Sequence, residues 1–387
     1  MRTIVTAARL WSPQGIIDNP VVEIEDDRIV EITSARESWA TPTHSFPNAT
    51  LAPAFFDVHF HGAAGHDVME ATPEALTAIG ALLARHGTAT YLATTVTAPL
   101  DATLRAVSGL AKLIAHPDLI HAQKQIARPI GIHLEGPFLS HAKRGVQPAE
   151  HLLQPDIATF DRLFDAADGH VRLMTLAPEL PGALELAKHA TAHGVRVSIG
   201  HSDANTAQAL AAVAAGAVSA THTFNAMRPL DHRDPGILGI TLSDDRLYAE
   251  LICDGVHVAP EMVKLWWRAK GGQRGILITD AMSATGMPDG EYQLGGFAVQ
   301  VANGRAMARG VLAGSILTQD RALSNFIRFT GAPIDQAIRL LTANPAAMTA
   351  LGDEAASIKE GAPANLVAVD REGNLLASIV ESCIFAV

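Results

Sequence analysis

Apolar residues in the middle of this chain follow two kinds of pattern, and the two alternate. Short strand-like runs, such as the one at 88–95, end at polar or turn-forming residues. Between such runs lie alanine- and leucine-rich segments with helical spacing, such as 72–87, 180–194 and 259–272, each of which ends at glycine. Because glycine commonly follows the last turn of a helix, we predict amphipathic helices there. The alternation is typical of repeated βα units on a parallel sheet.

Eight strand-like runs can be counted in this central region. Their expected ends lie at His61, Thr95, Glu135, Ala177, His201, His222, Asp254 and Asp280. Eight βα units over about 250 residues predict a (β/α)8 barrel of the TIM type, an α/β fold. A doubly wound sheet is the alternative. It requires a glycine-rich phosphate turn after its first strand, which residues 59–67 imitate poorly.

The two ends of the chain have a different texture, with short strands separated by turns. We expect them to pack together as a small β-sandwich domain built from residues 1–52 and 355–387. The barrel domain would then occupy residues 53–354.

Composition narrows the class of protein. The chain has 387 residues, of which 48% are hydrophobic, and a formal net charge of −11 at pH 7. That charge, without any basic run, argues against nucleic acid as a partner. Two cysteines in no metal-like spacing fit a reducing compartment. The first residues lack the apolar core of a signal peptide, and the run at 209–220 is too short to span a bilayer. We expect a cytoplasmic protein with no membrane partner.

The segment FFDVHFHG, at 55–62, places two histidines two residues apart in an extended, aromatic-rich run. Because side chains alternate across a strand, His59 and His61 should point to the same face. Two imidazoles on one face can bind a metal ion such as zinc, iron, nickel or copper, although the spacing also arises by chance. Other parts of the chain have to supply the remaining ligands.

Further histidines and carboxylates stand at the expected strand ends. With the first pair, the set is His59, His61, Glu135, His201, His222 and Asp280. Each has an ordinary alternative, such as a helix cap for His201 or a turn for Glu135, but in a barrel all strand ends converge on one face. Four imidazoles and two carboxylates exceed the ligands of one tetrahedral ion. We therefore predict two adjacent divalent ions, bridged by Glu135, and hydrolytic chemistry in which a carboxylate transfers a proton.

Five motifs carry a resemblance to a known family. They are the His-x-His of 59–61, HLEGPF (133–138), IGHSDA (199–204), THTFNAM (221–227) and ITDAMSATG (278–286). Along essentially the whole chain these resemble the amidohydrolase superfamily and, within it, the N-acetylglucosamine-6-phosphate deacetylase family. The resemblance implies metal-dependent hydrolysis of the N-acetyl group of N-acetylglucosamine 6-phosphate, which gives glucosamine 6-phosphate and acetate.

The resemblance also implies roles for single residues. Glu135, His201 and His222 correspond to metal ligands common to the family. His59 and His61 correspond to the pair present in its two-metal members. Asp280 corresponds to the catalytic aspartate, which we also expect to bind metal. The substrate contacts implied in the same way are Gln147, Asn225, Ala226, Arg233, His257, Leu312, Ala313 and Gly314.

Two of these contacts, Arg233 and His257, correspond to phosphate ligands, and the resemblance implies a homodimer in which Arg233 reaches the neighbouring site. Gln147 stands where some relatives carry a histidine thought to polarise the acetyl carbonyl. It can donate a hydrogen bond but carries no charge.

Several alternatives stay open at this point. Arg233 and His257 favour a phosphorylated amino sugar but do not separate the gluco from the galacto isomer, and another amidohydrolase such as a deaminase is a further candidate. A non-catalytic scaffold is disfavoured because Asp280 and every expected ligand are present. The donors do not select the metal, since zinc, our first choice, shares them with iron, manganese and cobalt.

Overall fold

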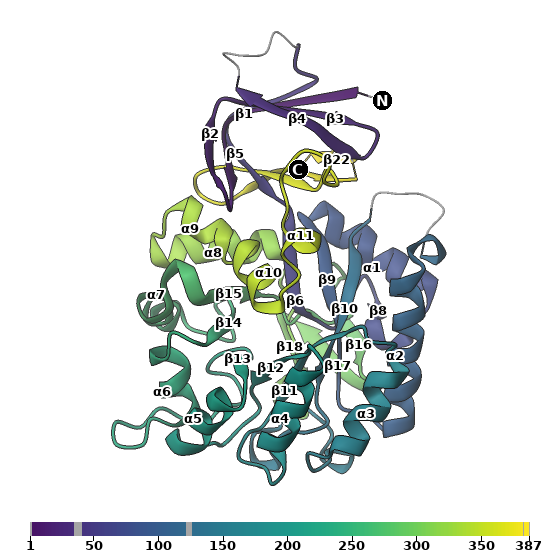
Figure 1. Ribbon diagram of the computed structural model, residues 1–387, viewed down its shortest axis with the longest axis vertical. Coiled ribbons are helices and arrows are strands. Elements are labelled where there is room, and N and C mark those ends of the chain that lie inside the picture. Colours follow the sequence, from purple (N-terminus) through teal and green to yellow (C-terminus); the bar gives the residue numbers. More distant parts are fainter. Residues whose placement is uncertain (1, 35–40, 121–125, 382, 387) are drawn as a thin grey trace.

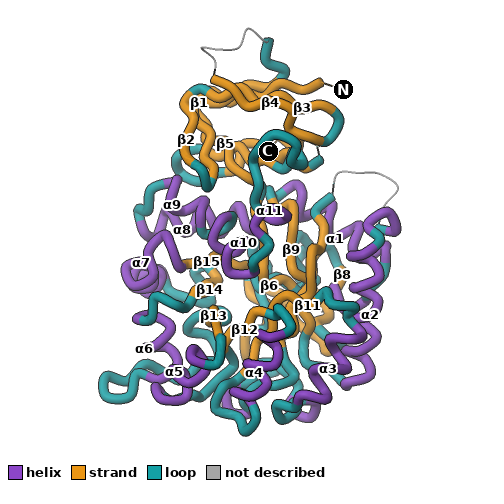
Figure 2. The backbone as a smooth tube through the Cα atoms, in the orientation of Figure 1, coloured by secondary structure: helices purple, strands orange, loops and turns teal. Residues whose placement is uncertain are grey.

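The computed structural model describes residues 2–34, 41–120, 126–381 and 383–386. Two bodies are apparent in Figure 1: a large barrel with helices around it, and a smaller body of strands that contains both chain ends. In Figure 2 the helices lie outside the central strands. Among the described residues, no helix has both the length and the apolar character needed to cross a bilayer.

The barrel is an eight-stranded parallel sheet whose strands pair in chain order. These strands are β6 (Phe55–Phe60), β9 (Thr88–Thr95), β10 (Arg128–Glu135), β11 (Val171–Leu176), β12 (Arg196–Ile199), β13 (Ala217–Ala220), β14 (Tyr248–Ile252) and β15 (Gly275–Ile278). The first and last strands meet where the Asp280 N–H donates to the His59 carbonyl at 2.9 Å, so the sheet is nearly closed. Consecutive pairing and closure exclude the doubly wound alternative. Each expected strand end lies at or just beyond an observed one.

Helices cover the outside of the barrel. They are α1 (Pro73–Arg85), α2 (Leu100–Ala115), α3 (Ile157–Ala166), α4 (Ala183–Ala192), α5 (Thr206–Ala214), α6 (Gly236–Ser243), α7 (Pro260–Arg274), α8 (Gln319–Thr330), α9 (Ile334–Arg339), α10 (Ala343–Thr349) and α11 (Gly352–Ala355). The first shows the local cause: the Thr72 side chain accepts from the Ala75 N–H at its start, and Leu76, Ile79 and Leu83 are buried along one face. The three predicted helical segments are confirmed as α1, α4 and α7.

Polar side chains, rather than only branched apolar ones, fill part of the barrel interior. Each strand or its end contributes at least one fully or almost fully buried polar residue, among them Asp57, Thr94, His133, Thr175, Ser198, Thr221, Glu250 and Thr279. Hydrogen bonds join several of them, for example between His133 and Thr175 and between Thr175 and Thr221, both at 2.8 Å. Buried polar groups destabilise a fold unless they are hydrogen-bonded, so these bonds make a polar barrel interior possible.

The smaller body is one eight-stranded sheet made from both chain ends. Its strands are β1 (Arg2–Ser12), β2 (Gly15–Asp18), β3 (Pro20–Glu25), β4 (Arg28–Ser34), β5 (His44–Pro53), β20 (Leu366–Val369), β21 (Leu375–Val380) and β22 (Cys383–Ala386). The two ends join where β20 pairs antiparallel with β5, and Val5, Leu51 and Leu366 share one buried cluster. A separate β body from both termini is therefore confirmed, while its description as a sandwich stays a prediction.

An inserted sheet between β15 and α8 was not predicted. Its four antiparallel strands are β16 (Gly290–Leu294), β17 (Phe297–Ala302), β18 (Arg305–Ala308) and β19 (Val311–Leu312). Its buried residues Leu294 and Val299 pack with Val96, which lies just beyond β9. The insertion therefore covers part of the barrel mouth. Shorter elements are β7 (Gly62–Ala63), β8 (His66–Asp67) and the 3-10 turns η1 (Val68–Glu70), η2 (Pro117–Leu119), η3 (His141–Lys143) and η4 (Ala149–His151).

Candidate active site at the barrel mouth

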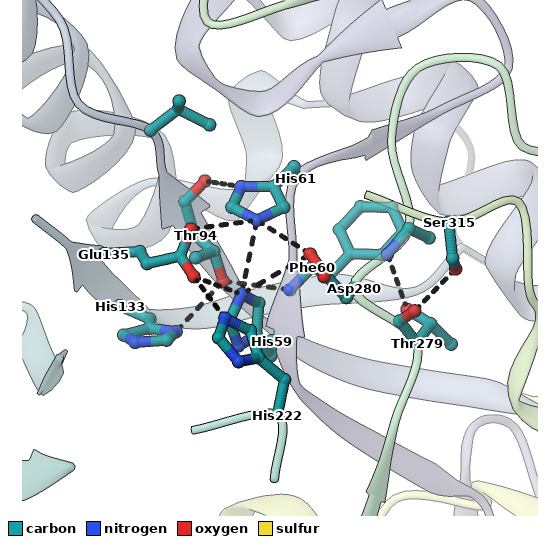
Figure 3. Close-up of polar contacts among 12 residues, drawn as sticks. His59, Phe60, His61, Thr94, His133, Glu135, His222, Thr279, Asp280 and Ser315 are labelled. Atoms are coloured by element: carbon teal, nitrogen blue, oxygen red, sulfur yellow. Dashed lines mark hydrogen bonds and ion pairs between the residues drawn. The ribbon is translucent and has the colours of Figure 1, made fainter. Parts of the chain in front are cut away.

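The six residues predicted as metal ligands meet at the carboxyl ends of the strands. Figure 3 shows His59, His61, Glu135, His222 and Asp280 pointing toward one another. Their donor atoms form two groups in which all atoms lie within 4.8 Å of one another: His59, His61 and Asp280, and Glu135, His201 and His222. The two groups adjoin at Glu135, whose Oε1 is 3.3 Å from His59 Nε2 and whose Oε2 is 3.5 Å from His61 Nε2.

Left-handed backbone conformations at the strand ends orient several of these side chains. His201, His222 and Asp280 all have left-handed φ values, of 46°, 29° and 52°. A non-glycine residue in such a conformation costs on the order of 1–3 kcal/mol, so the surrounding structure has to hold it. Asp280 is held on both sides: its N–H donates to the His59 carbonyl, and its own carbonyl accepts from the Ser315 N–H at 2.7 Å.

The imidazoles are oriented so that their Nε2 atoms face the centre of the cluster. His61 Nδ1 lies 3.0 Å from the Thr94 carbonyl, and His201 Nδ1 lies 3.0 Å from the Lys143 carbonyl. A carbonyl only accepts, so in both rings Nδ1 carries a proton, and in the neutral ring Nε2 is then the nitrogen with a lone pair for a metal. The Nδ1 of His222 is buried with no hydrogen-bond partner among the described residues.

The close approach of these nitrogens tests whether the residues suit a metal. The Nε2 atoms of His59 and His61 are 3.2 Å apart, and those of His201 and His222 are 3.0 Å apart. A cation near both nitrogens of a pair would stabilise their two lone pairs at that distance. Imidazole and carboxylate are ligands of divalent transition metals, so the donor set fits such ions.

The two carboxylates keep their negative charge in this buried place. Burial raises the pKa of Glu135, but the neighbouring imidazoles of His59, His201 and His222 outweigh that effect and hold the pKa well below its usual range. Burial likewise raises the pKa of Asp280, and His59 and His61 reverse the effect, so that this pKa is also lowered. Two ionised carboxylates among imidazoles attract cations rather than anions.

The cluster borders a cavity of about 210 Å³. Most predicted substrate contacts line it: Gln147, Asn225, Ala226, His257, Leu312 and Gly314. Arg233 does not line it and is exposed on the loop before α6, and the side chain of Ala313 is fully buried beneath the inserted sheet. Their contacts with substrate remain predictions. Larger cavities of about 630 and 700 Å³ contain none of the six clustered residues.

Gln147 and His257 lie on the cavity wall with defined partners. Gln147 Nε2 donates to Glu135 Oε2 at 2.8 Å, and its Oε1 accepts from the Thr97 N–H at 2.8 Å. His257 Nδ1 lies 2.7 Å from Asp254 Oδ2. Burial lowers the pKa of His257, but Asp254 outweighs it, and the net pKa is raised. The His257 ring therefore tends to carry a positive charge beside the cavity.

Sequence reasoning missed two buried carboxylates near the cluster. Asp57 is fully buried and accepts a hydrogen bond from Thr279 Oγ1 at 2.5 Å, which links β6 to the end of β15. Glu250 is fully buried in β14 and lies 3.3 Å from His59 Nδ1. A signal was present in both cases, because carboxylates are rarely placed inside apolar strands without a partner.

Comparison with known proteins agrees with this geometry. A sequence model of the amidohydrolase family matches residues 50–383, which include the barrel and all six clustered residues. The chain belongs to the amidohydrolase family. The family is metal-dependent, and the two groups of candidate ligands fit that dependence. The curated relatives act on amide bonds. The predicted resemblance is thus confirmed.

Relatives and solved structures narrow the family further. The N-acetylglucosamine-6-phosphate deacetylase of Lysinibacillus sphaericus is 37% identical over 350 residues, which cover 90% of this chain and 89% of the relative. The N-acetylgalactosamine-6-phosphate deacetylase of Escherichia coli O157:H7 is 37% identical over 371 residues, 96% of each chain. A structure of the Mycobacterium smegmatis N-acetyl-D-glucosamine-6-phosphate deacetylase, in complex with N-acetyl-D-glucosamine-6-phosphate, matches at TM-score 0.91 and 35% identity over 100% of both chains.

Proposed function

We propose that this amidohydrolase removes the acetyl group of N-acetylglucosamine 6-phosphate and releases acetate and glucosamine 6-phosphate. One observation carries the proposal: a single cavity joins a cluster of six candidate metal ligands to a wall with a positively polarised imidazole, His257. The first feature suits amide hydrolysis, and the second suits a phosphate group. Relatives with this activity match over most of both chains.

We propose that the site holds two divalent ions, zinc before iron, manganese or cobalt. One would be bound by His59, His61 and Asp280, and the other by His201 and His222, with Glu135 between them. Ions bound there would polarise the acetyl carbonyl and lower the pKa of water.

Asp280 is the residue that we propose moves the proton. Its side chain is 12% exposed, compared with 4% for Glu135, so it is the more accessible carboxylate of the two. Its lowered pKa keeps it ionised and able to act as a base. It takes a proton from the attacking water while the water oxygen bonds to the acetyl carbon. It returns that proton to the amine nitrogen as the carbon–nitrogen bond breaks.

The remaining contacts position the sugar. We propose that Asn225 and Ala226 contact the sugar phosphate and that the segment 312–314 lines the sugar. Gln147 holds Glu135 in place through its 2.8 Å hydrogen bond. His257 binds the phosphate together with Arg233 of the neighbouring subunit of a homodimer. A phosphorylated sugar does not cross membranes freely, which supports a cytoplasmic location. The buried cluster of the terminal sheet supports a division into 1–52 plus 355–387 and 53–354.

A second candidate substrate is the galacto isomer, N-acetylgalactosamine 6-phosphate. A relative with that specificity is as similar as the gluco-specific ones and covers 96% of both chains. The two sugars differ at the C4 hydroxyl.

Acetate release from both 6-phosphates and from both unphosphorylated sugars tests the proposal, with bound metal measured on the same preparation. We expect the highest kcat/KM for N-acetylglucosamine 6-phosphate and much lower values for the sugars without phosphate. A higher value for the galacto isomer would favour the second candidate. Equal rates with and without phosphate would contradict the phosphate contact, and no acetate from any of the four would contradict the proposal.

A further inference from the structure

Glu250 is a buried acidic side chain that the proposed mechanism does not use. It lies in the middle of β14 and is fully buried. Its Oε2 lies 3.3 Å from His59 Nδ1 and accepts from the His222 N–H at 3.4 Å. Its Oε1 has no hydrogen-bond partner among the described residues. A carboxylate in the interior of a barrel is unfavourable unless it forms hydrogen bonds with its neighbours. The contacts of Glu250 therefore point to a function.

The contact with His59 differs in kind from those of the other ligand imidazoles. The Nδ1 atoms of His61 and His201 meet backbone carbonyls. Of the four clustered rings, His59 is the one whose Nδ1 meets a carboxylate. A backbone carbonyl that accepts from Nδ1 fixes the orientation of the imidazole ring. A carboxylate that accepts from Nδ1 also makes Nε2 a stronger electron donor to a metal ion.

The position of Glu250 in the barrel also links the two ligand groups. Strand β14 pairs with β15, and the end of β15 meets β6 where the barrel nearly closes, so the Glu250 side chain reaches across the interior to His59. On the other side, β14 adjoins β13, and His222 and Thr223 follow that strand. The Thr223 N–H donates to the Glu250 backbone carbonyl at 2.8 Å. Together with the bond from the His222 N–H to the Glu250 side chain, this gives two hydrogen bonds between Glu250 and the backbone at 222–223. His59 and His222 belong to different ligand groups.

We infer that Glu250 is a positioning residue that orients His59 Nε2 toward the metal bound by His59, His61 and Asp280. Its bond to His222 is through the backbone alone, so the ring of His222 depends on it less than the ring of His59 does. Metal binding at the His59 group should therefore depend on Glu250 more than binding at the Glu135 group does. This inference rests on the two-metal centre of the proposed function.

Three variants and one reference test the inference. Glu250→Leu removes the acceptor and leaves His59 Nδ1 unpaired, while Glu250→Gln keeps an amide oxygen that still accepts from it. Asp254→Asn is the matched control, because Asp254 follows the same strand but contacts His257 rather than a ligand. The double variant His59→Gln with His61→Asn is the reference for a site reduced to one ion.

Bound zinc is measured at buffered free zinc concentrations, with circular dichroism on each variant to verify folding. We expect Glu250→Leu to weaken one of the two ions by about 10–100-fold and to leave the other with the affinity seen in the reference variant. Glu250→Gln should fall between Glu250→Leu and the wild type, and Asp254→Asn should keep both ions. Unchanged affinities in Glu250→Leu would overturn the inference, and so would equal weakening of both ions.

If Glu250→Leu does not fold, Glu250→Gln decides the matter, because it keeps the shape of the side chain: unchanged affinity at both sites would then overturn the inference. Wild-type acetate release is measured separately. Selective loss of one ion in a protein that releases no acetate would support the role of Glu250 while contradicting the proposed function. A wild type with a single ion that Glu250 variants do not weaken would contradict both the two-metal centre and this role.

Discussion

Asp280 brings together, in one residue, the properties of a proton carrier. It is fixed by hydrogen bonds on both sides of its backbone, its carboxylate is ionised, and its side chain reaches the cavity. Asp280→Asn keeps the size of the side chain and removes the base. We expect kcat to fall by at least ~10²–10⁴-fold while the substrate still binds. Steady-state kinetics with metal analysis check this, and near-normal turnover with both ions bound would mean that another group moves the proton.

His257 offers a test at the same scale through its charge. Burial lowers the pKa of His257, but the 2.7 Å contact with Asp254 has the larger, opposite effect, and the net pKa is raised. His257 therefore stays protonated to a higher pH than an ordinary histidine. Binding that needs this charge should be present at low pH and be lost as pH rises through the raised pKa. Asp254→Asn removes the charge that raises the pKa of His257, so burial then lowers this pKa. We therefore expect binding of the phosphorylated sugar to be lost at a lower pH in this variant.

The measurement is KM against pH for the phosphorylated sugar in the wild type and in Asp254→Asn. The phosphate itself titrates near pH 6, and the use of one substrate for both proteins cancels that contribution. Identical profiles for the two proteins would show that the charge of His257 does not contribute to binding.

At the scale of elements, the barrel strands were predictable and their polar interior was not. Parallel strands covered on both faces leave continuous apolar runs, which made their ends, and hence His201, His222 and Asp280, easy to locate. The role of Glu250 could not be predicted from the sequence, because it depends on a contact with His59, about two hundred positions away. Only the barrel fold brings these two residues together.

The inserted sheet escaped prediction for a different physical reason. Its strands are short and separated by glycine-containing turns at 295–296, 303–304 and 309–310, a pattern that is difficult to tell from a loop. Its buried residues include Leu294, which packs in the apolar cluster of Val96. Such an element is stabilised by packing on the barrel rather than by its own length, and a single sequence does not record that packing.

Strand β6 gives a prediction at this scale, because the strand and the residue that follows it bring His59 and His61 together, with their Nε2 atoms 3.2 Å apart. His59→Gln with His61→Asn should remove one ion and leave the other bound through Glu135, His201 and His222. These retain their own close spacing, with the Nε2 atoms of His201 and His222 3.0 Å apart. Metal content per chain checks the expectation. If the loaded wild type holds only one ion, the two-metal centre is wrong, although a hydrolytic site could still operate with the single ion.

At the scale of the whole molecule, we propose that the phosphate contact extends beyond one chain. The chain carries a formal net charge of −11, so binding of a phosphate requires local positive groups. His257 is one, while Arg233 is exposed outside the cavity of its own chain. We propose that a homodimer brings it to the neighbouring site, where its planar guanidinium suits a phosphate. Exposure in the single chain agrees with that role but also with an ordinary surface arginine.

Mixed dimers separate these two roles of Arg233. Arg233→Ala alone should weaken binding of the phosphorylated sugar tenfold to a hundredfold, as expected for a charge-assisted contact of ~1.5–3 kcal/mol, without changing metal content. In a dimer of one Arg233→Ala chain and one Asp280→Asn chain, the first chain keeps its Asp280 and receives the Arg233 of the second. Random mixing should thus restore about a quarter of wild-type activity at low substrate, since half of the dimers are mixed and each has one complete site. Activity no higher than the mean of the two parents would mean that each chain completes its own site, and Arg233 would then be a surface residue.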